Sequence, residues 1–211
     1  MSRWQPNARQ RLQSAALELF SEQGFAETTV PQITARAGLT TRTFFRYFSD
    51  KREVLFGDDV DMPGLAARII AEAPAELGPL QVIQGSLEAV AEAQFAGDVQ
   101  RFIARKAVID RDESLRAREM QKLAALSDAI NTGFQRRGVD ALTSALVAHT
   151  TVTVFGISIG RWLATKGATP LPELLHDTLD ALHTIMVDPA WPAEQLAPVS
   201  TARPDVAAQH D

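Results

Sequence analysis

The spacing of apolar residues along the chain predicts α-helices almost throughout. Leu12, Ala16, Leu19 and Phe20 fall on one face of a helix expected over residues 7–23, and a glycine follows directly. Prolines and glycines separate the later helical patterns, and no sequence repeat of fixed period is present. These helices are expected near residues 65–73, 79–95, 98–110, 114–136, 140–166 and 171–187. The pattern therefore predicts an all-α fold.

Two short helices joined by a tight turn are predicted directly after the first helix. Thr29 is a suitable N-cap, and Pro31 falls in the first turn, where a helix needs no backbone N–H. Gly38 interrupts the pattern where the chain must turn, and Thr40 can cap a second helix over Thr41–Phe48. These lengths and punctuation are typical of a helix-turn-helix.

The second of these helices has one apolar side and one basic side. On a helical wheel, Phe44 and Phe48 lie together, whereas Arg42 and Arg46 point outward one turn apart. Guanidinium groups suit guanine edges and phosphates, and hydroxyls near a helix N-terminus can reach the DNA backbone or a base. An ordinary amphipathic helix with solvated arginines is the alternative. We expect DNA contacts from Thr29, Thr40, Thr41, Arg42, Thr43, Phe45, Arg46, Tyr47 and Lys51.

These residues resemble the tetracycline-repressor (TetR) family of bacterial transcription regulators over roughly residues 8–56. The resemblance implies that Thr29, Thr43, Tyr47 and Lys51 touch operator phosphates or nearby bases. Phe45 stands where the family often has tyrosine, and it lacks the hydroxyl for a phosphate hydrogen bond. Arg42 stands where glycine is common, so a different base or phosphate contact is expected there. The matching features are Phe20, Gly24-Phe25, Thr28-Thr29, Ile33, Ala37-Gly38, Thr43, the run Phe44–Phe48, and Lys51.

Three regions are expected along the chain. Residues 1–50 form the helix-turn-helix domain, and residues 51–187 form a larger helical domain for effector binding and dimerisation. A fourth helix, capped by Ser49-Asp50 and opening with Lys51, would link the two. Residues 188–211 contain four prolines and little periodicity, and this tail is expected to be partly disordered.

Composition and charge agree with a DNA-binding protein. Residues 1–56 hold eight Lys/Arg and five Asp/Glu, a net charge of +3, whereas the remainder holds 13 basic and 21 acidic residues, a net charge of −8. The positive end would face DNA, and the acidic bulk would discourage non-specific coating of it. The chain has no cysteine and no apolar N-terminal segment, which fits a cytoplasmic location without disulfides or thiolate metal sites.

The apolar segment between residues 141 and 166 allows three interpretations. Gly156-Ile157-Ser158-Ile159-Gly160 matches the G-x-S-x-G pattern of serine hydrolases, and Thr150–Val154 has strand-like propensity. A helical hydrolase using Ser158 and His149 is therefore the enzymatic alternative, although no strand–helix alternation surrounds the motif. A membrane span is the second possibility, because His149 is the segment's one ionisable group before Arg161. A buried helix of a bundle that is not an enzyme is favoured over both.

Helices 140–166 and 171–187 are expected to form a homodimer interface by packing as four helices across a two-fold axis. Glycines four residues apart allow close helix approach. The expected interface residues are Gly156, Gly160, Leu175, Leu179, Leu182 and His183. His176 and His183 share a helical face with Asp180, but no further ligand is evident, so we expect neither metal nor cofactor.

A pocket for a small, largely apolar effector is expected among the helices of residues 65–136. Arg101, Arg105 and Lys106 could serve an anionic head group of that effector or be solvated. A helix-turn-helix used only for protein contact is a further alternative, and it predicts no salt-dependent DNA affinity. The expected apolar lining is Phe95, Phe102, Ile103, Met120, Phe134, Phe155 and Trp162.

Overall fold

The computed structural model describes residues 8–56, 61–95 and 99–187, and every regular element in these ranges is an α-helix. The predicted all-α class is confirmed. The expected tail, residues 188–211, lies outside the described residues. The helices are α1 (Ala8–Gln23), α2 (Val30–Arg36), α3 (Thr41–Tyr47), α4 (Glu53–Phe56), α5 (Met62–Glu72), α6 (Pro79–Phe95), α7 (Val99–Arg111), α8 (Glu113–Arg136), α9 (Ala141–Ala164) and α10 (Leu171–Val187).

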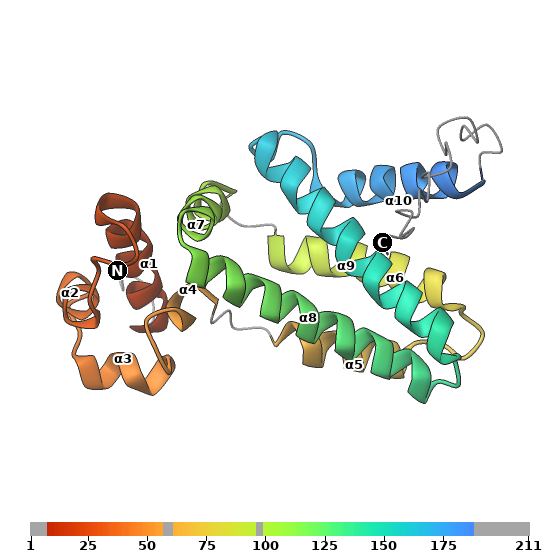
Figure 1. The fold of residues 1–211 in the computed structure, drawn as a ribbon, viewed down its shortest axis with the longest axis horizontal. Helices are drawn as coiled ribbons and strands as arrows, with labels where there is room; N and C mark the ends of the chain where they lie inside the picture. The colour runs from red at the N-terminus through yellow and green to blue at the C-terminus, as the bar shows by residue number, and fades with distance from the viewer. Residues whose placement is uncertain (1–7, 57–60, 96–98, 188–211) are drawn as a thin grey trace, which may run out of the picture.

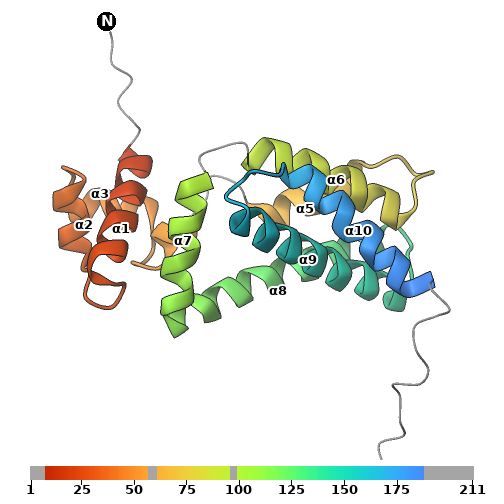
Figure 2. The ribbon, with the colours of Figure 1, turned by 90° about the horizontal axis from the view of Figure 1, so that it is seen from above.

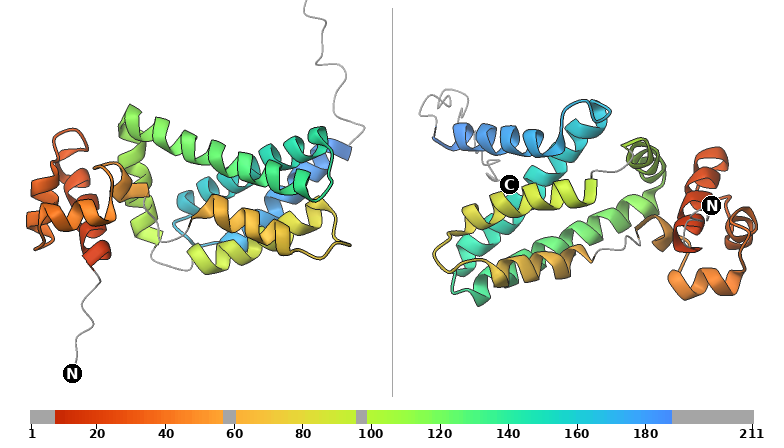
Figure 3. Two further views of the ribbon diagram at one scale, coloured as in Figure 1. Left: turned by 90° about the horizontal axis from the view of Figure 1, so that it is seen from below. Right: turned by 180° about the vertical axis from the view of Figure 1, so that it is seen from behind.

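The molecule is elongated, with a small head at one end and a larger helical body at the other (Figure 1). Helices α1–α4 form the head, and α5, α6, α8, α9 and α10 form the body. Helix α7 stands between the two and crosses the molecule, as the view from above makes clear (Figure 2). Within the body, α5 lies along α8, and α9 packs against both α8 and α10 (Figure 3).

Side-chain caps fix the two short helices of the helix-turn-helix. The Thr29 backbone N–H donates to Gln32 Oε1 at 2.8 Å, and the Gln32 N–H returns a bond to Thr29 Oγ1 at 3.4 Å. This reciprocal capping box begins α2. Thr40 Oγ1 accepts the Thr43 N–H at 3.2 Å and begins α3. Between them Gly38 has φ +62°, a left-handed conformation that favours glycine.

The core of the head extends past the helix-turn-helix into the corner between α7 and α8. Phe44 is completely buried and its ring centroid lies 5.4 Å from that of Phe48. The same cluster includes Leu12 and Ile33 from the first two helices, all three apolar residues of α4, and Val108, Ile109 and Leu115 from α7 and α8. The head therefore shares one apolar core with the end of the body that faces it.

Polar contacts reinforce this junction. Glu53 of α4 pairs with Arg118 of α8, with the carboxylate oxygen 2.7 Å from Arg118 Nε. Lys122 Nζ donates to the Phe56 carbonyl oxygen at 2.6 Å. Arg118 and Lys122 both lie on α8, one turn apart, so α8 binds the short helix α4 at its two ends.

The body has a second apolar core, in which α9 and α10 are joined by buried hydroxyl groups. Ser158 is completely buried, and its hydroxyl lies 3.0 Å from Thr178 Oγ1 and 3.2 Å from the Leu174 carbonyl oxygen. The segment Thr150–Val154 is helical, so the local strand considered for it is absent. Tertiary packing between helices overrides its β-branched composition.

Two helices begin two or more residues from their expected start. Helix α4 begins at Glu53 and not at Lys51, because Asp50 Oδ1 accepts the N–H groups of both Arg52 and Glu53, at 2.7 and 3.2 Å. Helix α5 begins at Met62, three residues before the expected start, because Pro63 sits in its first turn.

The packing of α3 predicts that replacing two neighbouring phenylalanines lowers the free energy of unfolding by very different amounts. Phe44→Ala removes a completely buried ring, and we expect it to lower the free energy of unfolding by about 3–5 kcal/mol. Phe45 is 58% exposed, so Phe45→Ala should change it by less than about 1 kcal/mol. Urea unfolding followed by circular dichroism measures both. Equal losses in the two variants would contradict this arrangement of α3.

Candidate nucleic-acid interface

The outward face of α3 carries exposed basic and aromatic side chains. Arg42, Phe45 and Arg46 are exposed, and Tyr47 is at the margin with 36% of its surface accessible. The Arg46 guanidinium lies 4.8 Å from the Tyr47 ring centroid and donates to its hydroxyl at 3.0 Å. Arg42 forms no ion pair with any residue in the described ranges. Its five donors are therefore available to phosphates or base edges.

The four expected threonines have different local roles. Thr29 and Thr40 cap α2 and α3, so their hydroxyl oxygens already accept a backbone N–H. The Thr43 hydroxyl lies 3.0 Å from that of Thr40. Thr41, the first residue of α3, is exposed and no hydrogen bond of its hydroxyl occurs within the described ranges. A capped, outward-facing helix N-terminus is thus presented with Thr41 at its tip.

Lys51 is held inside the head. Its ammonium donates to the carbonyl oxygens of Phe25 at 2.5 Å and Thr28 at 2.7 Å, and a weaker contact reaches Ala26 at 3.4 Å. It also lies 4.1 Å from the Phe25 ring centroid. Burial lowers the pKa of Lys51, and the carboxylates of Asp112 and Glu27 partly offset this. The ammonium thus ties Lys51 to the backbone between α1 and α2.

Arg11 is a positioning residue that the sequence pattern did not single out. From α1 it donates to the Ala37 carbonyl oxygen at 2.5 Å, at the turn between α2 and α3. A β-carbon at Gly38 would lie only 3.0 Å from the same guanidinium nitrogen. Arg11 lies on the first helix beside apolar Leu12. From the sequence alone, an arginine there could equally be exposed to solvent.

The electrostatics of the helix-turn-helix favour a polyanion. No Asp or Glu occurs from Thr28 to Ser49. Arg36 is neutralised within the head, because its guanidinium is 2.9 Å from Glu22 and 3.4 Å from Glu18. The hydrogen bond from Arg36 lowers the pKa of Glu22. Arg42 and Arg46 therefore carry the uncompensated positive charge of α3.

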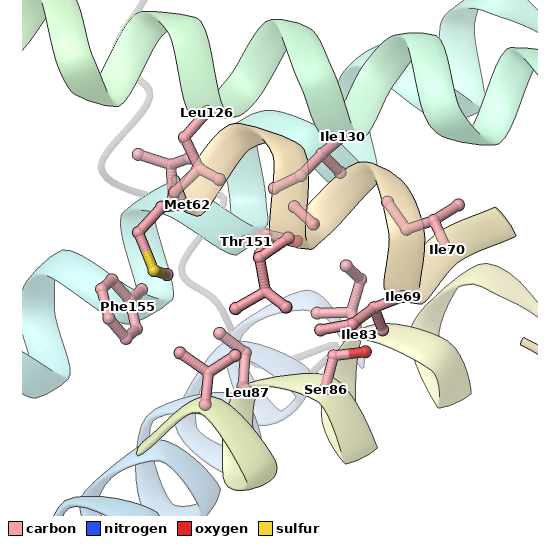
Figure 4. A pocket seen from close by; sticks show the side chains of 14 residues that line it. Met62, Ile69, Ile70, Ile83, Ser86, Leu87, Leu126, Ile130, Thr151 and Phe155 are labelled. Atoms are coloured by element: carbon pink, nitrogen blue, oxygen red, sulfur yellow. The ribbon is translucent and has the colours of Figure 1, made fainter. Parts of the chain in front are cut away.

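An apolar cavity of about 50 Å³ lies in the body between α5, α6, α8 and α9 (Figure 4). Its polar lining groups are the Ser86 and Thr151 hydroxyls, which donate back to the Val82 and Val147 carbonyls of their own helices. Among the described residues, no charged side chain lines it. The lining residues are Met62, Leu65, Ala66, Ile69, Ile70, Ile83, Ser86, Leu87, Val90, Leu126, Ile130, Thr151, Val152 and Phe155.

Phe155 alone among the seven expected pocket residues lines this cavity. Phe95, Phe102 and Trp162 form an aromatic cluster with it, at centroid distances of 5.1–5.9 Å. The other three lie elsewhere: Phe134 is buried core, Ile103 is half-buried on α7, and Met120 is 65% exposed. The sequence analysis missed the α5 and α6 lining, although its apolar residues recur at helical spacing.

The three cations near Phe102 also lie away from the cavity. Arg101 donates to Gln13 of α1 at 3.2 Å, and the Arg105 guanidinium lies 5.4 Å from the Phe56 ring centroid. Lys106 pairs with Asp110 and Glu119. They contact the head or the α7–α8 corner, and none of them lines the cavity as an anion-binding group.

An apolar surface runs along the outer side of α9 and the end of α10. Gly156 and Gly160 are exposed, and a β-carbon at either would meet no atom within 4 Å. His183 is exposed, and Leu179 and Leu182 are half-buried. Leu175 is only 1% exposed and belongs to the body core, so it cannot contact a second chain. The exposed apolar residues that sequence reasoning missed here are Leu142, Leu146, Ile157, Ile185, Met186 and Val187.

The hydrolase constellation is not assembled. Ser158 donates its hydroxyl to α10 groups and has no exposed surface, whereas His149 is exposed on the same helix. The nine intervening residue steps separate them by about 13 Å along the axis. His149 Nδ1 instead lies 3.4 Å from the Ser127 hydroxyl.

Neither a metal site nor an isolated membrane segment is evident in the described residues. No group of three or more His, Asp or Glu side chains there could hold a metal ion, and His176 pairs with Asp180 at 3.4 Å. Helix α9 is long and apolar enough to cross a membrane. It packs against α6, α7, α8 and α10, which accounts for the apolar residues on its inner side.

Two family models together match most of the chain. The model described as "Bacterial regulatory proteins, tetR family" matches residues 12–56, and that of the "MftR C-terminal domain" matches residues 77–186. The HTH-type transcriptional regulator TcmR of Streptomyces glaucescens is 42% identical over 84 residues, which are 39% of this chain and 36% of TcmR. The match thus spans little more than a third of that relative.

Solved structures share the fold. Thermus thermophilus FadR, a TetR-family repressor in complex with lauroyl-CoA, is 25% identical with a TM-score of 0.53, covering 88% of this chain and 98% of FadR. NalD of Pseudomonas aeruginosa, the secondary repressor of the MexAB-OprM multidrug efflux pump, is 19% identical with a TM-score of 0.57. That superposition covers 83% of this chain and 94% of NalD and concerns the fold alone.

The contacts of Lys51 predict that its replacement lowers stability without changing the salt dependence of DNA binding. Lys51→Met keeps the aliphatic stem and loses the bonds to the Phe25 and Thr28 carbonyls, which should lower the free energy of unfolding by about 1–2 kcal/mol. The slope of log affinity for DNA against log salt should stay unchanged, because the Lys51 ammonium binds backbone carbonyls and not a phosphate. Arg46→Met is the matched control and should lower that slope by about one. A Lys51→Met slope lowered by one would assign Lys51 to a phosphate.

Proposed function

The chain belongs to the tetR family of bacterial regulatory proteins, and we propose that it binds operator DNA as a homodimer and represses transcription until a small apolar effector binds. Members of the family are DNA-binding transcription regulators with a helix-turn-helix. The operator, the dimer, the sense of regulation and the effector are our inferences. A DNA-binding regulator of this kind acts in the cytoplasm, where the chromosome lies.

The observation that carries the DNA-binding proposal is the outward face of α3. A short helix, capped at its N-terminus by Thr40 and backed by a completely buried Phe44, presents two uncompensated arginines and an exposed Thr41. A recognition helix lies in the major groove with its N-terminal residues against base edges. We assign Arg42, the second residue of α3, to a guanine and Arg46 to a phosphate.

The apolar surface of α9 and α10 supports the dimer. Exposed Ile157 lies between Gly156 and Gly160, whose missing side chains would let a partner helix approach closely. A monomer with this surface open to water would expose a long apolar strip. A two-fold axis through α9 and α10 would place two heads on the same side, so that two α3 helices read half-sites about one DNA turn apart, ~34–36 Å.

The cavity supports an uncharged, apolar effector. Its lining offers hydrocarbon and two hydroxyl acceptors, and no charged group to neutralise an anion. A drug-sized ligand needs about 300–1,000 Å³, so binding would push α5, α6, α8 and α9 apart. FadR binds lauroyl-CoA. An acyl chain of that kind matches this lining chemically, whereas its coenzyme A phosphates would find no partner among the cavity residues.

Selection of bound sequences from random duplex DNA tests the proposal, followed by a salt titration on the selected site. We expect a two-fold-symmetric site with a steep salt dependence. Arg42→Ala should relax the preference at one position in each half-site, losing about 1–3 kcal/mol of discrimination there. Arg36→Ala is the matched control, because Arg36 is paired with Glu22, and it should leave the selected sequence unchanged. Failure to enrich any sequence would refute operator binding.

The proposed dimer surface predicts a selective effect of charge. Ile157→Glu places a carboxylate on the α9 surface, and we expect it to shift the protein from dimer to monomer and to weaken binding to the full site at least tenfold. Met120→Glu, a substitution at a 65% exposed residue of α8, should leave the dimer intact. Sedimentation velocity measures both. A dimeric Ile157→Glu variant would place the interface elsewhere.

The cavity predicts stabilisation by neutral apolar compounds. Fatty alcohols of increasing chain length should raise the melting temperature, because a ligand at 100 times its Kd stabilises the native state by about 2.7 kcal/mol. Ala66→Leu fills the lining and should abolish the response, whereas Ala67→Leu, on the same helix but outside the lining, should retain it. Equal responses in both variants would show that these compounds bind outside the cavity.

A further inference from the structure

Phe45, on the outward face of α3, has an apolar ring whose chemistry the proposed function leaves unused. The chain has ten phenylalanines, all in the described residues, and Phe45 alone is exposed, at 58%. Its ring meets the Phe44 ring edge-on at a centroid distance of 5.4 Å. Phe44 is completely buried, so it gives Phe45 a fixed support. The result is a rigid apolar projection on an otherwise polar face.

The surroundings of Phe45 identify what covers it. Thr41, Arg42 and Arg46 are its helical neighbours, and no acidic residue occurs from Thr28 to Ser49. Helix α3 lies in the head, whereas α9 and α10 lie in the body beyond α7, so the proposed dimer surface does not reach it (Figure 1). An aromatic group on a helix that also carries two arginines suits a polyanion with an apolar feature. In the DNA major groove that feature is the C5-methyl group of thymine.

We propose that Phe45 reads a thymine methyl group in each operator half-site and so determines specificity there. The inference rests on the proposed operator binding, and it assigns a contact that needs no hydroxyl at this position. Phe45 follows Arg42 by three residues, about 4.5 Å along the helix axis, which corresponds to one or two base pairs. The thymine should therefore lie one or two base pairs from the base that Arg42 selects.

The test uses the full-length protein and its selected operator. Each thymine is replaced in turn by deoxyuridine, which removes only the methyl group and keeps the base pairing. One replacement should weaken binding about fourfold, the effect of one buried methyl, and replacement in both half-sites about sixteenfold. Phe45→Ala should bind the thymine and deoxyuridine operators equally. Tyr47→Ala is the matched aromatic control and should retain the difference.

The outcomes separate this inference from the proposed function. A selected operator without thymine near the Arg42-dependent position would overturn the inference, as would methyl dependence that persists in Phe45→Ala. Methyl dependence lost only in Tyr47→Ala would assign the contact to Tyr47 and overturn it as well. All three leave operator binding intact. If no sequence is selected from random DNA, operator binding and methyl recognition both fail.

Discussion

The apolar core shared between the head and the α7–α8 corner is the constraint on which the rest of the structure depends. Val54, Leu55 and Phe56 of α4 pack with α1 on one side and with Val108, Ile109 and Leu115 on the other. A four-residue helix has little stability of its own. It exists here because both of its faces are buried and α8 holds its ends through Arg118 and Lys122. The orientation of α3 is therefore tied to that of α8.

The same helix forms a wall of the cavity. Leu126 and Ile130 of α8 line it, one to three turns beyond the residues that hold α4. A drug-sized ligand needs a cavity of about 300–1,000 Å³, so it must displace at least one wall of this one. Displacement of α8 carries Arg118 and Lys122 with it. An effector could thus alter the head spacing through one continuous helix, provided that it binds one spacing more tightly than the other.

Sequence reasoning succeeded where a local signal determines the structure. Periodicity and caps located the helices, with α6 and α10 matching the expected ranges of 79–95 and 171–187. It did not reveal contacts between distant segments. Lys51 lies next to the recognition unit in sequence, yet the carbonyls at Phe25 and Thr28 hold its charge. Leu175 has the helical spacing of an interface residue but packs inward.

The effector pocket shows the same limit. Phe95, Phe102 and Trp162 were expected to line the pocket, but they pack against one another. The cavity is lined instead by aliphatic residues of α5 and α6, which carry no sequence signal distinct from ordinary core. The cavity forms only where side chains from four helices that are distant in sequence come together, so no single segment predicts it.

The distance between the two heads of a dimer tests the central claim most directly. The chain has no cysteine, so Ala35→Cys on exposed α2 gives a single spin-label site per chain for pulsed dipolar spectroscopy. With the selected operator, the account predicts one narrow distance distribution that sets the recognition helices about one DNA turn apart, ~34–36 Å. A ligand that fills the cavity should shift that distribution. No dipolar coupling between labels, or a distribution that neither operator nor ligand alters, would contradict the account.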